Sequence, residues 1–269
     1  MNIEEYIRLS NDGDTLLHST REGDCVLQVH EHNDYRWVFT GGVSILSMMC
    51  LSAPADPVLP CNTAMLAALL FRTSPESVLN LGFGTGSNER FFFDRLPDTE
   101  IVSIDTSLSL ANIARTHFQI GRDWPVIIQA ADDYLDTNTR TFDLVLCDIF
   151  ANEQHPQCLF NASFYTGIAH SLNPGGVMAL NLSPADDGEL LEILVAIRQS
   201  FSSVLLIKLP DCGNFVLLAM QHRPPALKDM TIPLQFCKDR YQLDFSHILE
   251  NLTVLPDRQN NDARSPREV

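Results

Sequence analysis

The residues with the clearest capacity for chemistry form a glycine-rich turn, LGFGTGS, between Leu81 and Ser87. An apolar run precedes the turn and a helical pattern follows it. Glycines let the backbone pass close to a ligand, and the free N–H groups at a helix start can bind polar atoms. A dinucleotide fingerprint needs a glycine where Ser87 stands, so the turn instead predicts a site for a nucleoside with a short charged tail. The residues expected to bind it are Gly82, Phe83, Gly84, Thr85 and Gly86.

Carboxylates follow at or just after the ends of the next apolar runs. Asp105 ends IVSID and precedes Thr106, and a carboxylate there can accept hydrogen bonds from both hydroxyls of a ribose. Its other possible role is that of a helix N-cap, which Ser107 could also fill. Asp132 and Asp133 come after the run 126–130. Contact with the amino group of a base and capping of a short helix explain these two acids equally well.

Asp148 ends the run FDLVLCD and is the expected catalytic residue. The carboxyl ends of parallel strands form the ligand-binding edge of an open α/β sheet, so Asp148 should lie beside the glycine turn. A carboxylate at this point can hold a cationic ligand or take a proton from an attacking amine. A solvated cap at the end of a strand is the alternative.

Alternating patterns predict the elements that place these residues. Five apolar runs alternate with helical patterns, which indicates a parallel sheet covered by helices on both faces. The runs are 78–82, 101–105, 126–130, 142–148 and 176–182, and the helical patterns are 87–95, 108–118, 162–172 and 188–201. Two later runs, 204–209 and 214–221, are joined by a turn too short for a parallel crossover, so we place an antiparallel hairpin at the sheet edge.

Turn signals divide the first third of the chain into four short strands, followed by a helix over 60–71. The strands are expected at 15–20, 25–32, 36–40 and 43–50. We therefore expect three regions. They are a small antiparallel β domain over 1–58, a Rossmann-like nucleoside-binding domain with a C-terminal helical addition over 59–256, and a disordered tail over 257–269.

Composition limits the class of protein. The 269 residues are 45% hydrophobic and 19% charged, as in a globular protein. Thirty-four acids against 18 bases give a net charge of −16, which argues against nucleic acid as a partner. No leader peptide or membrane-length apolar run is visible, so we expect a cytoplasmic protein.

Two other groups of reactive residues are interpreted as structural. Seven cysteines form no C-x-x-C pair and are expected to be reduced core thiols. His30, Glu31 and His32 alternate along a strand, but no third firm ligand accompanies the histidines, so no metal site is expected.

The chain resembles the polyamine aminopropyltransferases, the spermidine synthase family, from about residue 20 to 255. The resemblance is clearest in ILSMMCLSAPADPVLPCNTAMLAALLF, which leads into the glycine turn. It is equally clear in FDLVLCDIFANEQHPQCLFNASFYTGIAHSLNPGGVMALNL, which contains Asp148. It implies a Rossmann-like class I S-adenosylmethionine-dependent methyltransferase fold with a small N-terminal antiparallel β domain, in a homodimer. It also implies transfer of an aminopropyl group from decarboxylated S-adenosylmethionine to a diamine. In that reaction Gly82, Gly84, Gly86 and Asp105 hold the nucleoside and Asp148 helps to deprotonate the amine.

Several positions depart from the pattern of that family, mostly at the acceptor and the donor tail. Ala151 stands at its second acid, Leu46 at a glutamine that contacts the donor, and Cys61 and Leu209 at tyrosines near the acceptor. The family has an acidic residue followed by a glycine that contact the adenine, and Ala130 and Ala131 stand at these two positions. Asp132, two residues after Ala130, is the nearest acid that could replace that contact. Loss of several charged or polar contacts weakens the expectation of tight diamine binding.

The leading interpretation is a spermidine synthase-like transferase that uses decarboxylated S-adenosylmethionine or S-adenosylmethionine and modifies an amine, such as a di- or polyamine. A small-molecule methyltransferase and a non-catalytic nucleoside-binding protein remain alternatives, because the same turn and Asp105 serve all three. An acidic rim favours a cationic ligand. Its expected members, in loops without Lys or Arg, are Asp105, Asp132, Asp133, Asp148 and Glu153.

Overall fold

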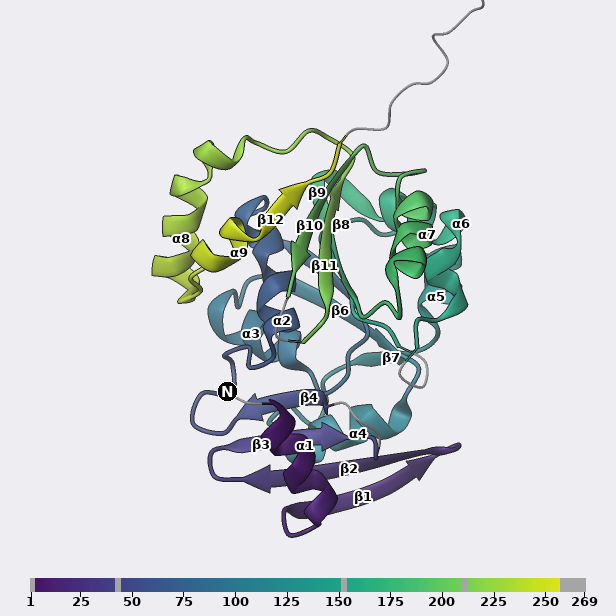
Figure 1. Cartoon of the computed structure of the whole chain (residues 1–269), viewed down its shortest axis with the longest axis vertical. Helices are drawn as coiled ribbons and strands as arrows, with labels where there is room; N and C mark the ends of the chain where they lie inside the picture. Colours follow the sequence, from purple (N-terminus) through teal and green to yellow (C-terminus); the bar gives the residue numbers. More distant parts are fainter. Residues whose placement is uncertain (1–2, 42–44, 151–153, 210–211, 257–269) are drawn as a thin grey trace, which may run out of the picture.

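Two β-sheets, one above the other in Figure 1, organise the chain. The computed structural model describes residues 3–41, 45–150, 154–209 and 212–256. The smaller sheet has four strands in the order β1-β2-β3-β4, and the larger has eight in the order β12-β10-β11-β9-β8-β5-β6-β7. None of the described helices is long and apolar enough to cross a lipid bilayer.

The N-terminal sheet is an antiparallel meander, as the turn signals predicted. Its strands pair with their neighbours along the chain; they are β1 (Leu16–Glu22), β2 (Cys25–His32), β3 (Tyr35–Phe39) and β4 (Ile45–Cys50). A helix that the strand pattern did not predict, α1 (Ile3–Asp12), precedes them. Its apolar side chains pack with Trp37, whose Nε1 donates a hydrogen bond to Ser10 Oγ at 2.7 Å. The N-terminal unit is therefore a sheet with a helix on its outer face.

The large sheet confirms the predicted parallel arrangement. Parallel ladders join β5 (Ser77–Leu81), β6 (Glu100–Asp105), β7 (Val126–Ile128), β8 (Phe142–Cys147) and β9 (Leu172–Leu182). The predicted hairpin is present as β10 (Ser203–Lys208) and β11 (Phe215–Met220). Its predicted place at the sheet edge was wrong, because β12 (Leu252–Val254) pairs with β10 and forms the edge. Three residues are too few to show a strand period, so the pattern missed β12.

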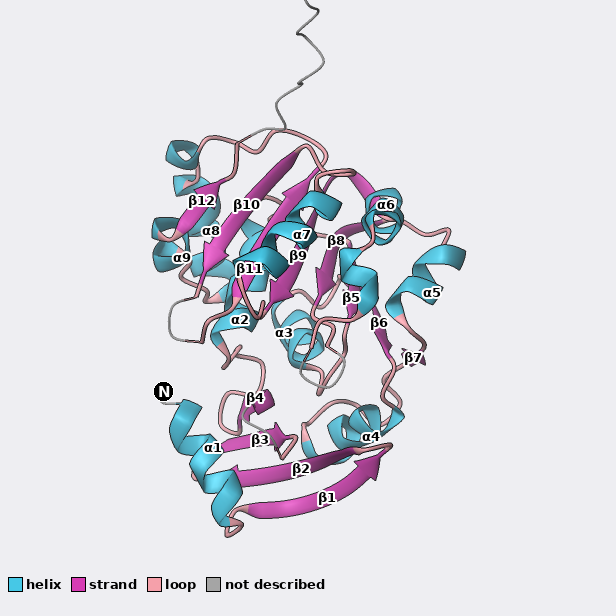
Figure 2. Cartoon of the chain, turned by 45° about the vertical axis from the view of Figure 1, so that its right-hand side comes forward, coloured by secondary structure: helices cyan, strands magenta, loops and turns pink. Residues whose placement is uncertain are grey.

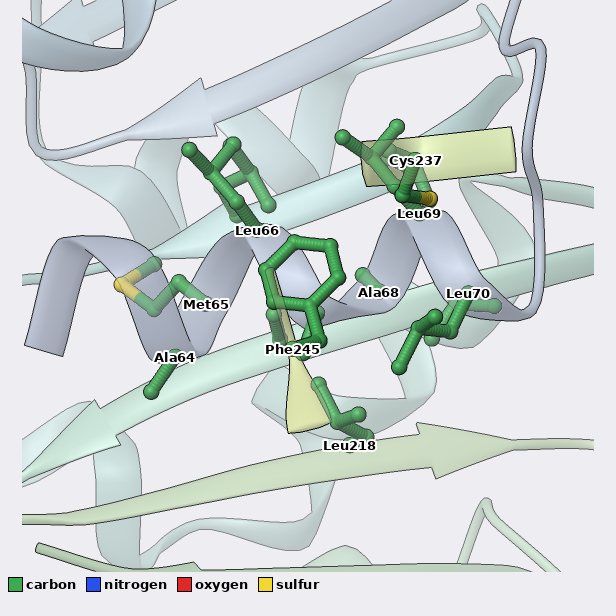
Figure 3. Close-up of a cluster of buried hydrophobic side chains, with 14 of the residues drawn as sticks. Ala64, Met65, Leu66, Ala68, Leu69, Leu70, Leu218, Cys237 and Phe245 are labelled. Carbon is green, nitrogen blue, oxygen red and sulfur yellow. The ribbon is translucent and has the colours of Figure 1, made fainter. Parts of the chain in front are cut away.

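Helices cover both faces of the large sheet. One face is covered by α2 (Pro60–Met65), the 3₁₀ helix η1 (Leu66–Leu70), α3 (Ser87–Arg95), α8 (Thr231–Tyr241) and α9 (Ser246–Glu250). Figure 3 shows part of that core, where Phe245 lies next to Leu218 of β11 and Leu69 lies next to Cys237 of α8. The other face is covered by α5 (Ala131–Thr137), the 3₁₀ helix η2 (Gln157–Phe160), α6 (Ala162–His170) and α7 (Asp187–Ile197). A last 3₁₀ helix, η3 (Leu227–Asp229), leads into α8.

Helix α4 (Leu108–His117) joins the two sheets. Its buried Leu110 and Ile113, together with Phe118, pack against Leu27 and Val38 of the N-terminal sheet. Figure 2 shows α4 lying along β2 and β1, directly below the strands of the large sheet. The N-terminal unit thus packs against the helix that follows Asp105, which places that unit next to the predicted nucleoside loop.

Candidate functional site

The glycine turn has a backbone that only glycine adopts readily. Gly82, Gly84 and Gly86 have φ angles of 97°, 56° and 77°, which L side chains rarely accept. A Cβ at Gly82 would lie 2.1 Å from the carbonyl oxygen of Asp148. The missing side chain therefore lets the end of β5 run directly against the end of β8. This contact brings the predicted nucleoside loop and the predicted catalytic residue together.

Asp105 lies at the end of β6 and holds the glycine turn in place. Its Oδ2 accepts a hydrogen bond from Gly84 N at 2.8 Å, and its Oδ1 accepts one from Ser107 N at 2.8 Å. Ser107 Oγ accepts from Leu110 N at 2.9 Å, so Ser107 and not Asp105 is the N-cap of α4. Burial raises the pKa of Asp105 and the nearby charge of Glu22 raises it further, while hydrogen bonds from backbone N–H groups lower it. Thr106, the next residue, is exposed.

Asp148 follows β8 directly and is half-buried. Its N–H donates to Leu81 O at 2.8 Å, which continues the parallel ladder by one residue. Asn181 Nδ2 donates to its Oδ1 at 2.8 Å. Burial raises the pKa of the Asp148 carboxyl and the nearby charge of Asp105 raises it further, while Asn181 lowers it. Because the negative charge of Asp105 disfavours a second negative charge on Asp148, a cation bound at this edge would be stabilised.

Asp132 and Asp133 lie in the first turn of α5 and are exposed. The helix begins at Ala131 with Ala130 at the N-cap and no side-chain capping bond, so neither aspartate is the cap that one interpretation predicted. Asp132 instead lines a small cavity of about 140 Å³ between α5 and α6, together with Cys158 and Asn161. Burial raises the pKa of the Cys158 thiol, and the negative charge of Asp132 raises it further.

Cys61, Leu46 and Leu209 depart from the family pattern and lie within the described residues. Cys61 lies on α2, and burial together with the nearby charge of Asp148 raises the pKa of its thiol. Leu46 on β4 is 40% exposed, and the half-buried Leu209 packs on the core under β10. Ala151 and Glu153, predicted to follow Asp148 in the same loop, lie outside the described residues.

Three contacts that the sequence patterns did not reveal connect the N-terminal unit to this site. Ser47 of β4 hydrogen-bonds with Thr85 in the glycine turn. Glu22 at the end of β1 accepts hydrogen bonds from Ser107 Oγ and, at 3.2 Å, from Ser109 N. These partners are tens of residues apart in sequence, so no local pattern could have identified them. The N-terminal sheet thus helps to hold the glycine turn and the start of α4 in place.

The sequence patterns also did not reveal the role of Arg90 on α3, which binds the glycine turn. The guanidinium is almost fully buried and donates to Thr85 O at 2.7 Å, Pro54 O at 2.7 Å and Phe118 O at 3.1 Å. These carbonyls belong to the glycine turn, the segment after β4 and the end of α4. Arg90 therefore fixes the turn to the two segments that flank it.

The other reactive residues have structural partners. His30 is buried, stacks on Trp37 and shares a 2.9 Å hydrogen bond with Thr15, while Glu31 forms an ion pair with Arg36. Within the described residues no group of three or more His, Cys, Asp or Glu side chains could hold a metal ion. All seven cysteines are free thiols, of which Cys147, Cys158 and Cys237 are buried.

Comparison with known proteins gives this geometry a family context. A family model described as a methyltransferase domain matches residues 78–176. A polyamine aminopropyltransferase from Chromobacterium violaceum is 28% identical over 238 residues, which cover 84% of this chain and 88% of that protein. Over most of its length the chain is similar to polyamine aminopropyltransferases. The similarity includes the N-terminal unit as well as the large sheet, because it covers most of both chains.

Solved structures show the same fold. A probable spermidine synthase from Corynebacterium glutamicum has a TM-score of 0.66 and 19% identity, covering 84% of this chain and 94% of that one. A spermidine synthase in complex with the transition-state analogue AdoDATO has a TM-score of 0.58 and 18% identity, covering 77% and 73%. The predicted Rossmann-like fold with an N-terminal antiparallel sheet is thereby confirmed.

Proposed function

We propose that this protein transfers an aminopropyl group from decarboxylated S-adenosylmethionine to an amine. The observation that carries the proposal is the placement of two acids, Asp105 and Asp148, on either side of the glycine turn, at the carboxyl edge of the sheet. A sulfonium donor that also carries an amine is a dication, which suits this acidic edge. The relationship to polyamine aminopropyltransferases supports the same donor.

The donor would lie along the carboxyl edge of the large sheet. Its ribose hydroxyls can complete the acceptor positions that Asp105 has left beyond Gly84 N and Ser107 N. The turn from Gly82 to Gly86, with Phe83 and Thr85, would pass under the nucleoside, and Thr106 would border it. We assign the base end to the start of α5, where Asp132 and Asp133 lie in the first turn. These binding roles are part of the proposal.

The reaction is a direct displacement. The acceptor nitrogen attacks the carbon next to the sulfonium, the new C–N bond forms as the C–S bond breaks, and the bonding electrons stay on sulfur, which leaves as methylthioadenosine. The attacking amine must be neutral, so a base has to remove one proton. The half-buried carboxylate of Asp148 fits this role, and placing the two reactants in line accounts for much of the expected rate gain. As written, the chemistry requires no metal ion.

A small-molecule methyltransferase is the second candidate, because the methyltransferase domain model matches residues 78–176, which include the glycine turn, Asp105 and Asp148. S-adenosylmethionine carries a free carboxylate that its decarboxylated form lacks. That carboxylate would approach Asp148, whose pKa is already raised by burial and by the nearby charge of Asp105. Repulsion at this edge therefore favours the decarboxylated donor.

Product analysis with a base-deleted variant tests the proposal. The protein is incubated with each donor and a panel of mono-, di- and polyamines, and methylthioadenosine and S-adenosylhomocysteine are measured by mass spectrometry. Asp148→Asn should abolish turnover and leave the affinity for uncharged methylthioadenosine within a few-fold, since it keeps the shape and removes the base. Asp187→Asn, which neutralises an exposed acid on α7, is the matched control. Turnover that survives in Asp148→Asn would disprove the assignment of the base.

The family relationship also leads us to propose a cytoplasmic homodimer that acts on a di- or polyamine. We further propose a division into an N-terminal domain over 1–58 and a nucleoside-binding domain over 59–256. The methyltransferase alternative would share this division but release a different product.

A further inference from the structure

Two asparagine–aspartate pairs occupy opposite ends of β9 and β8. At the amino ends of the strands, Asn173 Nδ2 donates to Asp143 Oδ1 at 3.1 Å. At the carboxyl ends, Asn181 Nδ2 donates to Asp148 Oδ1 at 2.8 Å. The parallel register pairs Cys147 with Leu180, so the next residues along the two strands, Asp148 and Asn181, lie side by side. Only this second pair lies at the edge with the glycine turn.

The second pair continues into a third residue. Asn214, which directly precedes β11, donates from Nδ2 to Asn181 Oδ1 at 3.0 Å. Asn181 is 3% exposed, so its amide has little access to water as a substitute partner. A carboxylate only accepts hydrogen bonds, so Asn181 must present its NH₂ to Asp148, and its oxygen must then accept from Asn214. The ionised state of Asp148 thus fixes the direction of both hydrogen bonds, from Asn214 to Asn181 and from Asn181 to Asp148.

We propose that Asn214 and Asn181 form a two-amide relay that positions Asp148 as the base of the proposed aminopropyl transfer. Asn181 holds Oδ1, and no described residue hydrogen-bonds to Oδ2, which is left to accept the proton from the acceptor amine. Asn181 is therefore a positioning residue, and Asn214 supports it from the neighbouring strand. The inference rests on the proposed function for its chemical meaning, but the relay itself can be tested without turnover.

The charge balance around Asp148 explains why such a relay is useful. Three titratable groups lie near Asp148. Asp105 at the end of β6 raises the pKa of Asp148, while the thiols of Cys61 on α2 and Cys147 on its own strand have their pKa raised by burial and by the charge of Asp148. None of them carries a positive charge. The NH₂ of Asn181 is the stabilising partner of the ionised carboxylate, and it lowers the pKa that burial and Asp105 raise. Without it, Asp148 would hold its proton to a higher pH and be a poorer acceptor near neutral pH.

The test is a titration of the Asp148 carboxyl by ¹³C NMR on protein labelled at aspartate Cγ, with Asp148→Asn used to assign the signal. Loss of a hydrogen bond to a charged group shifts the pKa of that group by about one unit or more. We therefore expect Asn181→Leu to move the midpoint upward by about one unit. Asn214→Leu should move it in the same direction by less. In the wild type and both variants, the acid limb of the kcat/KM profile should follow the NMR midpoint, while donor affinity stays within about two-fold.

The matched control is Asn173→Leu, which removes an equivalent amide from a buried aspartate at the other end of the same strand. It should lower the free energy of unfolding and leave the Asp148 titration unchanged. An unchanged midpoint in Asn181→Leu, or an equal shift in Asn173→Leu, would overturn the relay. If Asn181→Leu does not fold, Asn214→Leu decides, and no shift there overturns the proposal. A wild type that titrates as expected but converts no amine would instead refute the proposed function.

Discussion

The buried carboxyl of Glu89, beneath the glycine turn, should make the stability of this protein depend on pH in the neutral range. Glu89 is 0% exposed, and its Oε1 accepts from Asn80 Nδ2 and Ser103 Oγ, both at 2.7 Å. Its Oε2 has no hydrogen-bond partner within the described structure. Burial raises the pKa of Glu89 from 4.5 to about 7, against the smaller effects of Ser103 and Asn80. The native state therefore holds a proton that the unfolded chain releases at lower pH.

The sign and size of the effect follow from this difference in pKa. Below the unfolded pKa of 4.5 both states hold the proton, and as pH rises towards about 7 only the native state does. Stability is therefore lost as pH rises through the folded pKa. A difference of about 2.5 pH units, at about 1.36 kcal/mol each, corresponds to about 3 kcal/mol in total. About 2 kcal/mol of this should appear between about pH 5.5 and about pH 8, a range above the isoelectric point of about 4.7.

Urea unfolding of the wild type and Glu89→Gln, followed by tryptophan fluorescence, measures the effect. Glutamine is neutral in both states, so the stability of the variant relative to the wild type should increase by about 2 kcal/mol from about pH 5.5 to about pH 8. Glu192→Gln removes an exposed charge from α7 and controls for the change in net charge. If the difference between wild type and Glu89→Gln stays constant within about 0.5 kcal/mol across this range, the protonated state of Glu89 is refuted.

Two further substitutions test how the glycine turn is held. Gly82→Ala should cost about 3 kcal/mol or more, because the new Cβ would lie 2.1 Å from the backbone oxygen of Asp148. Gly84→Ala meets nothing within 4 Å and should cost only about 1–2 kcal/mol for its positive φ; equal losses in urea unfolding would contradict the close approach at Gly82. Glu22→Gln removes a negative charge at the start of α4 and should lower the free energy of unfolding by about 1 kcal/mol at low salt. That loss should shrink as salt rises, and a salt-independent loss would point to packing instead.

Local sequence patterns predicted the parts of the site that lie on single elements. Asp105 and Asp148 end apolar runs of a βα alternation, and that alternation requires their strand ends to meet at one edge of the sheet. The residues that orient them could not be predicted in this way. Asn181 contacts Asp148 across 33 positions and Glu22 contacts Ser107 across 85, so only the tertiary fold brings them together.

The missed elements have similar explanations. Helix α1 has apolar residues at Ile3, Tyr6 and Ile7, a spacing that could have revealed it. Because strand signals dominate the residues after it, the whole segment 1–58 was predicted to be a β domain. Strand β12 exists because β10 offers it an open edge, and its three residues have no period of their own.

Calorimetric titration with decarboxylated S-adenosylmethionine, S-adenosylmethionine and methylthioadenosine tests the central claim most directly. The claim is that the acidic edge formed by Asp105 and Asp148 beside the glycine turn binds a sulfonium nucleoside that has no carboxylate. The account predicts binding of methylthioadenosine and tighter binding of the decarboxylated donor than of S-adenosylmethionine. Tighter binding of S-adenosylmethionine, or no heat with any of the three nucleosides, would contradict it.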